Sequence, residues 1–539
     1  MYLCYDIKGI QRFIFSVPKL KCVVGASALI DQFDLDAKAR AQRAGVAWIF
    51  SGGGRGAFTC SDPATAERFE RQLVAAAHEI GVDIRIGLEA SLPKAAHHAD
   101  RLYPFCPENM EGTPCAVSGI WPAPPGRVHP LVRLRFANAR KDPLGRRVLD
   151  GLEQGGLLPA NLSRYQLAFF KNVNPKQDQD EEEPGAEEEA TAAQIALGRR
   201  NRWAVVAMDG NDMGRQFQAF EALQKQSDRS DDKTGQWLSA MSSGVKKCTH
   251  QAFLTALGSM ISQWAQGAAE DDDLDDCVIH STRSQDRPVL ILPFRPLILG
   301  GDDVILLCHT AFARPFVKRM AEEFGKRSKD AAQNSPIRPL WPATNDELTI
   351  SAGVLYAKVT FPLQPAIKYA ESLLASAKGT YRADPKKNIP TPPAVDWDTI
   401  TDTLVDTPAA RRNRELRFRD PELGREIHLT RRPYLLEKGK GGPDLESLES
   451  ITEKLAEIPR SVRATILPGL QQPWSERVAY TASLAKRQKF LWEQLREDSP
   501  HLGAAWHQAA DNGIQATGLP DALLLLDEEH RLNQARDND

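Results

Sequence analysis

The sequence has few cysteines, no long apolar run and almost no net charge, and each shortage excludes a class of protein. Eight cysteines among 539 residues are too few for a disulfide scaffold in so large a chain and are typical of a reducing cytosol. No apolar run reaches the roughly 18 residues that a membrane span needs, so we expect no membrane contact. The chain has 68 basic and 71 acidic residues, which gives a net charge of −3. Any contact with nucleic acid must therefore come from local patches.

The N-terminus also lacks the features of a signal peptide and begins with strand-like residues, which predicts a cytoplasmic protein. What the chain does have is an apolar content of 42%, which is ample for packed cores. Its length predicts about three or four domains. From changes in composition and periodicity we predict four segments, at residues 1–125, 126–195, 196–395 and 396–539.

The most informative stretch is Leu297–Cys308, in which Gly300, Gly301, Asp302 and Asp303 join two apolar runs. Val, Ile and Leu on both sides predict buried strands, and Gly-Gly-Asp-Asp predicts the tight turn of a β-hairpin. Adjacent carboxylates repel each other, so the turn indicates a site for a divalent cation. Taken alone, an ordinary Gly/Asp turn explains this motif equally well.

The sequence around the hairpin predicts the order β-α-β-β-α-β, and the same order is predicted at the N-terminus. In the later copy we expect a strand at 203–208, helices at 215–224 and 236–266, the hairpin, a helix at 311–329, a strand at 348–357 and a helix at 363–378. In the first copy we expect helical segments between 9 and 45, a helix at 63–80, and strands at 1–7, 46–50, 57–60 and 82–88. The repeated order predicts an α+β chain with two ferredoxin-like units and helical inserts. The turn of the first copy, Gly52–Gly56, carries no acid.

The stretches between the two copies are less regular. Residues 91–125 contain Cys106 and Cys115, whose spacing is half of a zinc site at most, so zinc and simple reduced cysteines both stay open. Residues 126–147 are basic, which is typical of a solvated helix face or of a phosphate-contacting surface. The acidic run at 175–191 predicts a disordered linker or a surface loop.

The second copy ends at the proline-rich stretch Pro385–Pro393. Beyond it, the apolar spacing in 396–539 predicts a helical C-terminal domain. Within that domain, residues 411–440 form a second basic stretch.

A third acid, Asp209, ends the first strand of the second copy. In a ferredoxin-like sheet this strand end lies beside the central hairpin turn, so we expect Asp209 to approach Asp302 and Asp303. Three carboxylates at one rim suit a two-metal nucleotidyl transferase. In such an enzyme one Mg²⁺ activates an attacking 3′-hydroxyl and the other neutralises the triphosphate and the leaving pyrophosphate.

Three more residues are candidates for contacts with a nucleotide. Gly210 and Gly214 would let backbone N–H groups approach a phosphate at a helix N-terminus. Lys378, near the end of the last helix, is suited to contact a triphosphate as a point charge. The alternative for Lys378 is that it only stabilises the helix dipole.

These motifs resemble those of a known family. Asp209-Gly-Asn-Asp-Met-Gly214, the Gly-Gly-Asp-Asp turn, and Ser351-Ala-Gly353 followed by 370–378 resemble the active palm of the large polymerase-like subunit of type III CRISPR effector complexes. Residues 6–15, 25–30 and 52–54 resemble the first palm of that family. More distantly, the second palm is similar to GGDEF-type diguanylate cyclases and class III nucleotide cyclases.

The resemblance implies a double-palm enzyme that works with the other type III subunits and a crRNA. When such a complex binds target RNA, the active palm joins ATP into cyclic oligoadenylates, which activate downstream effectors in antiviral defence. The implied site residues are Asp209, Asp302 and Asp303 for Mg²⁺ or Mn²⁺, Gly300 and Gly301 for the turn, Lys378 for the triphosphate, and Ser27 for a second nucleotide pocket.

The chain departs from the family pattern in two respects. Many large subunits begin with an HD nuclease domain, whereas here the first palm starts at residue 1, so we expect no cleavage of single-stranded DNA. Only Cys106 and Cys115 remain as candidates for the family's zinc-binding insertion. Three alternatives stay open: a non-catalytic scaffold that binds guide RNA through its basic stretches, a stand-alone minimal polymerase that makes a cyclic dinucleotide, and a substrate other than ATP.

Overall fold

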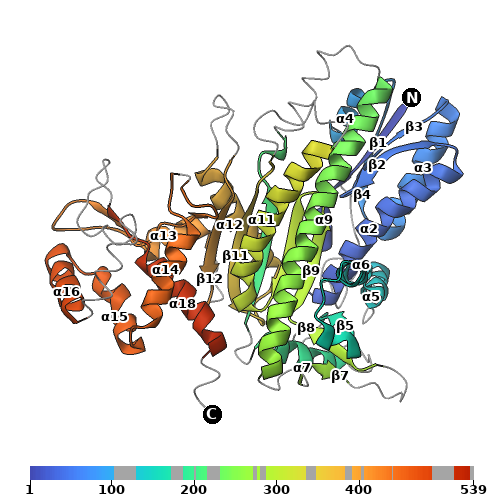
Figure 1. Cartoon of the computed structure of the whole chain (residues 1–539). Helices are drawn as coiled ribbons and strands as arrows, with labels where there is room; N and C mark the ends of the chain where they lie inside the picture. The colour runs from blue at the N-terminus through green and yellow to red at the C-terminus, as the bar shows by residue number, and fades with distance from the viewer. Residues whose placement is uncertain are drawn as a thin grey trace.

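The computed structural model describes residues 1–17, 19–101, 129–171, 186–198, 202–214, 231–270, 276–279, 287–334, 347–382, 391–401, 406–439, 441–487 and 515–533. It confirms that the chain is a mixed α+β protein. Figure 1 shows the N-terminal sheet at one side, a larger sheet in the centre and the C-terminal elements at the other side.

The first unit is a four-stranded antiparallel sheet in the order β2-β3-β1-β4. Its elements are β1 (Tyr2–Lys8), α1 (Ile10–Ile14), α2 (Leu20–Arg43), β2 (Ala47–Gly52), β3 (Arg55–Thr59), α3 (Pro63–Ile80) and β4 (Asp83–Glu89). The helix predicted at 63–80 is confirmed. Asp62 caps it by accepting a 2.8 Å hydrogen bond from the Thr65 amide, and Gly81 ends it in the left-handed conformation.

A helix that the sequence did not predict follows β4. Residues 91–125 were expected to be irregular, but α4 (Leu92–Arg101) packs on β4 and β1. The contact is close because Gly87 has no side chain: a Cβ there would lie 2.0 Å from the carbonyl oxygen of Ala95. Cys106 and Cys115 lie outside the described residues.

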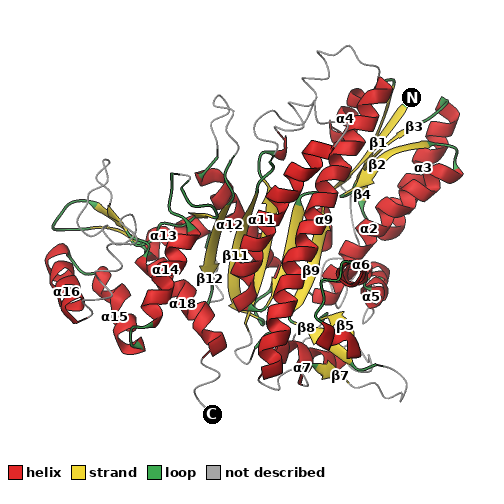
Figure 2. Cartoon of the chain, viewed as in Figure 1, coloured by secondary structure: helices red, strands yellow, loops and turns green. Residues whose placement is uncertain are grey.

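The second unit contains the larger sheet, in the order β15-β12-β11-β6-β10-β9. Its main elements are β6 (Arg202–Gly210), α9 (Asp231–Glu270), β9 (Phe294–Gly300), β10 (Asp303–Cys308), α11 (Thr310–Asn334), β11 (Ile350–Lys358) and α12 (Leu363–Thr380). The helices α9 and α11 lie side by side across the sheet (Figure 2), whereas α12 packs on β11, β12 and β6. The helix predicted at 215–224 lies outside the described residues.

The two units contact each other in a reciprocal way. α2 of the first unit packs on β9 of the second, and α9 of the second packs on β2 of the first. At the first contact, the Ser27 hydroxyl donates a 2.7 Å hydrogen bond to the carbonyl oxygen of Leu297. At the second, Lys246 extends to within 3.3 Å of the position that a Cβ of Gly52 would occupy.

The segment between the units is more ordered than the sequence suggested. It contains α5 (Pro130–Lys141), α6 (Pro143–Gln154), a 3-10 helix (Ala160–Arg164), β5 (Gln166–Phe169) and α7 (Ala186–Ala196). The acidic run was predicted to be a linker or loop through residue 191, which is wrong for its last part, because α7 begins at Ala186. Alanines on α7, including Ala190 and Ala193, are buried and give that helix an apolar face.

β5 also pairs with β8 (Val289–Leu292), which pairs in turn with β7 (Val278–Ile279). This small sheet lies at the start of β9, away from the hairpin turn, because β8 directly precedes β9 in the chain. In Figure 1 it lies beside α7.

The C-terminal segment is not purely helical, and the predicted boundary at 395 falls inside a strand. β12 (Ala394–Thr399) pairs in parallel with β11 and antiparallel with β15 (Tyr434–Leu435), so it extends the second sheet. Val395 and Trp397 are buried, which explains why this strand belongs to the core. The remaining elements are α13 (Pro408–Glu415), β13 (Arg417–Arg419), β14 (Glu426–His428), α14 (Leu445–Ala456), α15 (Arg460–Leu470), α16 (Trp474–Arg487), β16 (Gln515–Ala516) and α18 (Leu519–Asn533).

Several residues of the two basic stretches are internal rather than solvated. Arg135 is fully buried and donates to the Phe13 carbonyl oxygen at 2.9 Å. Arg412 forms a buried ion pair with Asp396, and Arg432 forms one with Asp521 of α18. Buried ion pairs of this kind fix one arrangement of the elements that they join.

The structure also bears on the predicted absence of a membrane span. Among the residues that it describes, no helix combines the length and apolar character that crossing a membrane requires.

Candidate active site

The predicted hairpin forms from β9 and β10, with Gly300 paired to Asp303 across the turn. Gly301 has a φ of 63°, in the left-handed region that glycine adopts without strain. Gly300 has open space where a Cβ would lie, so packing does not explain the glycine at that position. The turn places Asp302 and Asp303 next to each other at the rim of the sheet.

Asp209 lies at the same rim. It is the residue after Met208, which pairs with Val304 of β10, and on its other side it pairs with Ser351 of β11. Both hairpin aspartates share a side-chain hydrogen bond with Asp209. The structure therefore brings together the three acids that the sequence placed in one site.

The electrostatics of this centre are those of crowded acids. Burial, then the charge of Asp209 and the hydrogen bond with it, raises the pKa of Asp302 to about 7. Burial, followed by the charges of Asp209 and Asp302, raises the pKa of Asp303 to about 8. Part of the Asp303 side chain is exposed, yet its carboxyl group is surrounded by protein atoms and by the other two acids. Near neutral pH the Asp302 and Asp303 carboxyl groups are therefore partly protonated unless a cation replaces the protons.

Among the described residues, Lys378 is a cation that the chain itself supplies at this rim. Its Nζ atom lies 2.5 Å from Asp209 Oδ2 and donates a 2.7 Å hydrogen bond to the carbonyl oxygen of Gly210. The charge of Lys378 lowers the pKa values of Asp302 and Asp303, but the effects of burial and of the neighbouring acids are larger. Lys378 is thus held among the acids, and a role beyond stabilising its own helix is supported.

The other predicted residues occupy different surroundings. A Cβ at Gly210 would lie 2.8 Å from Asp302 Oδ2 and 2.8 Å from Met213 Cγ, so the glycine there makes room for the Asp302 carboxyl group. Gly214 has open space around it. Ser27 lies on α2 at the contact between the units, where its hydroxyl is bonded to Leu297, three positions before Gly300.

Sequence reasoning missed two residues beside the site, Asn211 and Asp212. Asn211 is 4% exposed, and its side-chain amide donates a 3.0 Å hydrogen bond to Thr349 Oγ1. Asp212 accepts hydrogen bonds from Thr391 and has a φ of 56°. The signal was present in the sequence, because Asn and Asp are the non-glycine residues that most readily adopt this conformation.

The donor atoms at this rim suit a hard divalent cation, since Mg²⁺ and Mn²⁺ are bound by carboxylate oxygens. Asp209, Asp302 and Asp303 are the residues that would hold it. Across the described residues, however, no three His, Cys, Asp or Glu side chains form a ready-made metal cage. The carboxylates would therefore have to turn toward the cation when it binds.

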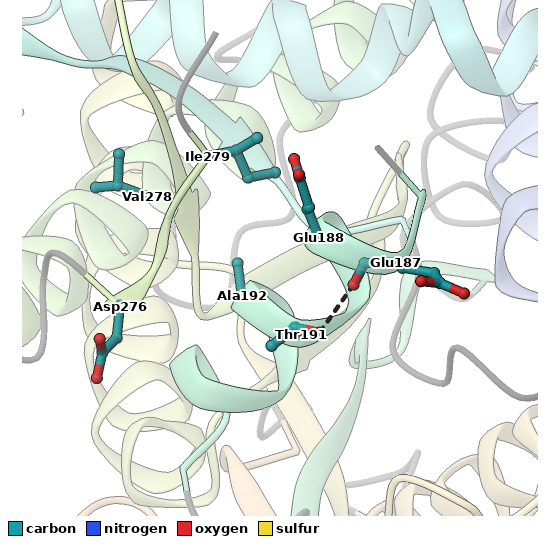
Figure 3. Close-up of a pocket in the computed structure, with 7 residues that line it drawn as sticks. All are labelled: Glu187, Glu188, Thr191, Ala192, Asp276, Val278 and Ile279. Carbon is teal, nitrogen blue, oxygen red and sulfur yellow. Dashed lines mark hydrogen bonds between the residues drawn. The ribbon is translucent and has the colours of Figure 1, made fainter. Parts of the chain in front are cut away.

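A separate cavity of about 450 Å³ lies between α7 and β7 and is lined by Glu187, Glu188, Thr191, Ala192, Asp276, Val278 and Ile279. Figure 3 shows that the three carboxylates point in different directions and do not converge, while the Thr191 hydroxyl is bonded to the carbonyl oxygen of Glu187. The cavity lies beside the small sheet at the start of β9, away from the hairpin turn. It has no part in the acidic centre.

Comparison with known proteins gives the class of the second unit. Residues 202–388 match the family model of the second palm domain of Cas10/Cmr2, so this unit is a palm domain. The matched segment contains Asp209, the hairpin turn and Lys378. The match confirms that the second unit resembles the active palm of the large subunit of type III CRISPR complexes.

A search of curated sequences found no relative. Among solved structures, the chain is similar to one in the Csm1-Csm4 cassette in complex with pppApA, with a TM-score of 0.40, 14% identity, and coverage of 98% of this chain and 68% of that one. It is also similar to one in the Csm1-Csm4 cassette in complex with cA4, with a TM-score of 0.35, 14% identity and coverage of 70% of this chain. The present chain covers 52% of that second chain, or about half of its length.

Proposed function

We propose that the protein is a nucleotidyltransferase of type III CRISPR defence that joins ATP molecules 3′ to 5′ at the acidic centre. The single observation that carries the proposal is the meeting of Asp209, Asp302 and Asp303 beside Lys378 within the Cas10/Cmr2 palm domain. Burial and the charge of Asp209 raise the pKa values of Asp302 and Asp303, which destabilises the fold at neutral pH. A bound divalent cation would offset this cost, so the arrangement supports a cation-dependent reaction.

In the proposed reaction the 3′-oxygen of one ATP attacks the α-phosphorus of another. The new phosphodiester bond forms as the bond to pyrophosphate breaks. Divalent cations, when bound, supply activation of the 3′-hydroxyl and neutralisation of the departing pyrophosphate. Asp209, Asp302 and Asp303 would hold these cations. Lys378, next to Asp209, would balance the negative charge of the triphosphate.

The wider setting of the proposal rests on the family resemblance. We propose that both sheet units are ferredoxin-like palms, of which the second is the active one, and that the product is a cyclic oligoadenylate released when target RNA is recognised. The partners would be the other type III subunits, a crRNA and its target, in the cytoplasm. A purely scaffolding role has less support, because Arg135, Arg412 and Arg432 of the basic stretches are used inside the fold.

The test is an assay of ATP turnover by the full chain with Mg²⁺ or Mn²⁺, with and without partner subunits and target RNA. We expect mass spectrometry to find adenylate products from the wild type and none from the Asp302→Asn/Asp303→Asn variant. Asp→Asn keeps the shape of the side chain and removes only the charge. Equal and null turnover by both proteins under every condition would refute the proposal, and the masses would also identify the base and the ring size.

A further inference from the structure

The turn that follows Asp209 is fixed by a closed set of hydrogen bonds. The Asn211 amide donates to the Thr349 carbonyl oxygen at 2.8 Å, and the Asn211 side chain donates to Thr349 Oγ1 at 3.0 Å. The Thr349 hydroxyl donates in turn to the Thr391 carbonyl oxygen at 2.6 Å. The Thr391 hydroxyl and amide donate to Asp212 Oδ2 at 2.5 and 3.2 Å.

This set of contacts connects three segments that are distant in the sequence. Thr349 directly precedes β11, and Thr391 lies just before β12, whereas Asn211 and Asp212 directly follow β6. The turn is therefore held by the starts of both strands that continue the sheet on that side. Thr391 is 2% exposed and Asn211 is 4% exposed, so water competes little for these bonds.

The position of the turn matters because Asp209 lies among charged groups, with Lys378 Nζ 2.5 Å from its Oδ2 atom. Its carboxylate is next to two other acids and is 36% exposed at the rim. On the strand side, β6 and β11 hold its backbone. Beyond Gly210, the described chain is held by the bonds of Asn211 and Asp212 and by Met213, which packs against the core. A glycine in between offers little stiffness of its own.

We propose that Asn211 and Asp212 are positioning residues, which anchor the turn to Thr349 and Thr391 and thereby keep Asp209 in place against Asp302 and Asp303. This proposal rests on the proposed function, since it assigns the two residues to the same site. It also assigns the Asp212 carboxylate to Thr391 rather than to a cation. The left-handed backbone at Asp212 directs the chain so that its side chain reaches Thr391.

The experiment uses three single variants of the full chain and one double variant. Asp212→Gly removes the carboxylate but keeps a residue that adopts a positive φ without strain. Asp212→Asn keeps an acceptor oxygen and the same backbone preference, and Thr391→Val removes only the hydroxyl. ATP turnover is measured against Mn²⁺ concentration, Mn²⁺ binding by electron paramagnetic resonance, and the exchange of the Asn211 amide by hydrogen-exchange mass spectrometry.

We expect Asp212→Gly to lower kcat by about 100-fold, because misplacing a reacting group by about 1 Å costs that much. We also expect it to raise the Mn²⁺ concentration needed for half-maximal turnover and to speed exchange at Asn211. Asp212→Asn and Thr391→Val should each lower kcat by about tenfold or less, because each weakens one hydrogen bond. The double variant Asp212→Gly/Thr391→Val should be no worse than Asp212→Gly, because both remove the same contact.

The outcomes separate this proposal from the proposed function. If the wild type turns over ATP and Asp212→Gly matches it in kcat, Mn²⁺ dependence and exchange, the positioning role is refuted. A variant that only melts at a lower temperature, with unchanged Mn²⁺ dependence of its folded fraction, refutes it too. If the wild type has no turnover, the proposed function fails, and faster exchange with weaker Mn²⁺ binding in Asp212→Gly still supports positioning. Unchanged exchange and Mn²⁺ binding in that case overturn it.

Discussion

The two sheet units have the same strand register at their centres but surround the central aspartate with different charged residues. In the first unit, Asp6 of β1 pairs with Arg55 of the hairpin and with Arg85 of the last strand. In the second, Asp209 of β6 pairs with Ser351 of the last strand and follows the residue that pairs with Val304. Asp6 and Asp209 therefore occupy equivalent positions in the two sheets.

The hairpins extend the equivalence and show where it breaks. Arg55 pairs with Gly52 across the first turn as Asp303 pairs with Gly300 across the second, so an arginine replaces an aspartate. Arg55 Nε lies 3.3 Å from Asp6 Oδ1, and Lys8 Nζ lies 2.5 Å from Asp6 Oδ2. The first unit neutralises Asp6 with its own side chains. The second crowds three acids around one lysine.

The scaffolds behind these turns are alike. α4 packs on β4 and β1 as α12 packs on β11 and β6. Both contacts depend on a glycine at the equivalent strand position: Gly87 pairs with Cys4, and Gly353 pairs with Ala207. At these equivalent strands the units therefore differ mainly in a few residues at the rim, and substitutions at paired positions can test that difference.

The largest expected effect comes from removing the equivalent acid in each unit. Asp209→Asn should lower ATP turnover by at least about 100-fold, because it withdraws a charge on which the proposed cation sites depend. Asp6→Asn is the matched control, and its turnover should stay within a few-fold of the wild type. Steady-state assays at saturating Mn²⁺ compare the two. A similar loss in both variants would mean that the first unit also takes part in the chemistry.

The next largest effect concerns the paired glycines. A Cβ at Gly353 would lie 2.1 Å from the Ala370 carbonyl oxygen, and one at Gly87 would lie 2.0 Å from that of Ala95. Backbone atoms cannot move aside as a side chain does, so Gly353→Ala and Gly87→Ala should each cost about 1–3 kcal/mol of stability or more. Urea unfolding measures both. A Gly87→Ala variant as stable as the wild type would show that α4 is held less tightly than α12.

A smaller effect, of opposite sign, is expected when the hairpin acids are neutralised. Because the folded pKa values of Asp302 and Asp303 are about 7 and 8, well above the usual carboxyl value, the folded state binds more protons than the unfolded state. The free energy of unfolding therefore falls as the pH rises from about 4 to about 8. Asp302→Asn/Asp303→Asn removes this loss, so it should melt about 2–4 °C above the wild type at pH 8.5.

Calorimetry with a chelator present, at pH 5 and at pH 8.5, checks this expectation. At pH 5 the two proteins should differ little, because the wild-type carboxyl groups are then protonated. A variant that melts below the wild type at pH 8.5 would contradict the picture of three crowded acids.

The rim was predictable from the sequence because its signals are local. Apolar runs on both sides of Gly-Gly-Asp-Asp specify the hairpin, and a buried strand that ends in Asp209 specifies the third acid. The strand pattern predicted where that strand ends, and the sheet order then brought it beside the turn. The contacts of Lys378 with Asp209 and Gly210 depend on how α12 crosses the sheet. The sequence spacing alone did not determine that crossing.

Other features could not be predicted from the sequence because they depend on contacts between segments that are distant in the chain. α4 is recognisable only once Gly87 is seen to admit a helix backbone, and β12 only once β11 offers its edge. Arg412 and Arg432 were counted in a basic stretch because their partners, Asp396 and Asp521, lie 16 and 89 positions away. A run of arginines thus gives no information on which members face solvent.

The smallest expected effect comes from Arg55, the residue that most clearly distinguishes the two turns. Its side chain is 67% exposed, and an exposed ion pair contributes about 1 kcal/mol or less. Since Lys8 remains beside Asp6, Arg55→Ala should change the free energy of unfolding by no more than that amount and should leave ATP turnover unaltered. Urea unfolding and the same turnover assay measure the two quantities. If stability stays constant but turnover falls tenfold or more, Arg55 contributes to the reaction from the first unit, and the division into a neutralised unit and an acidic one must be redrawn.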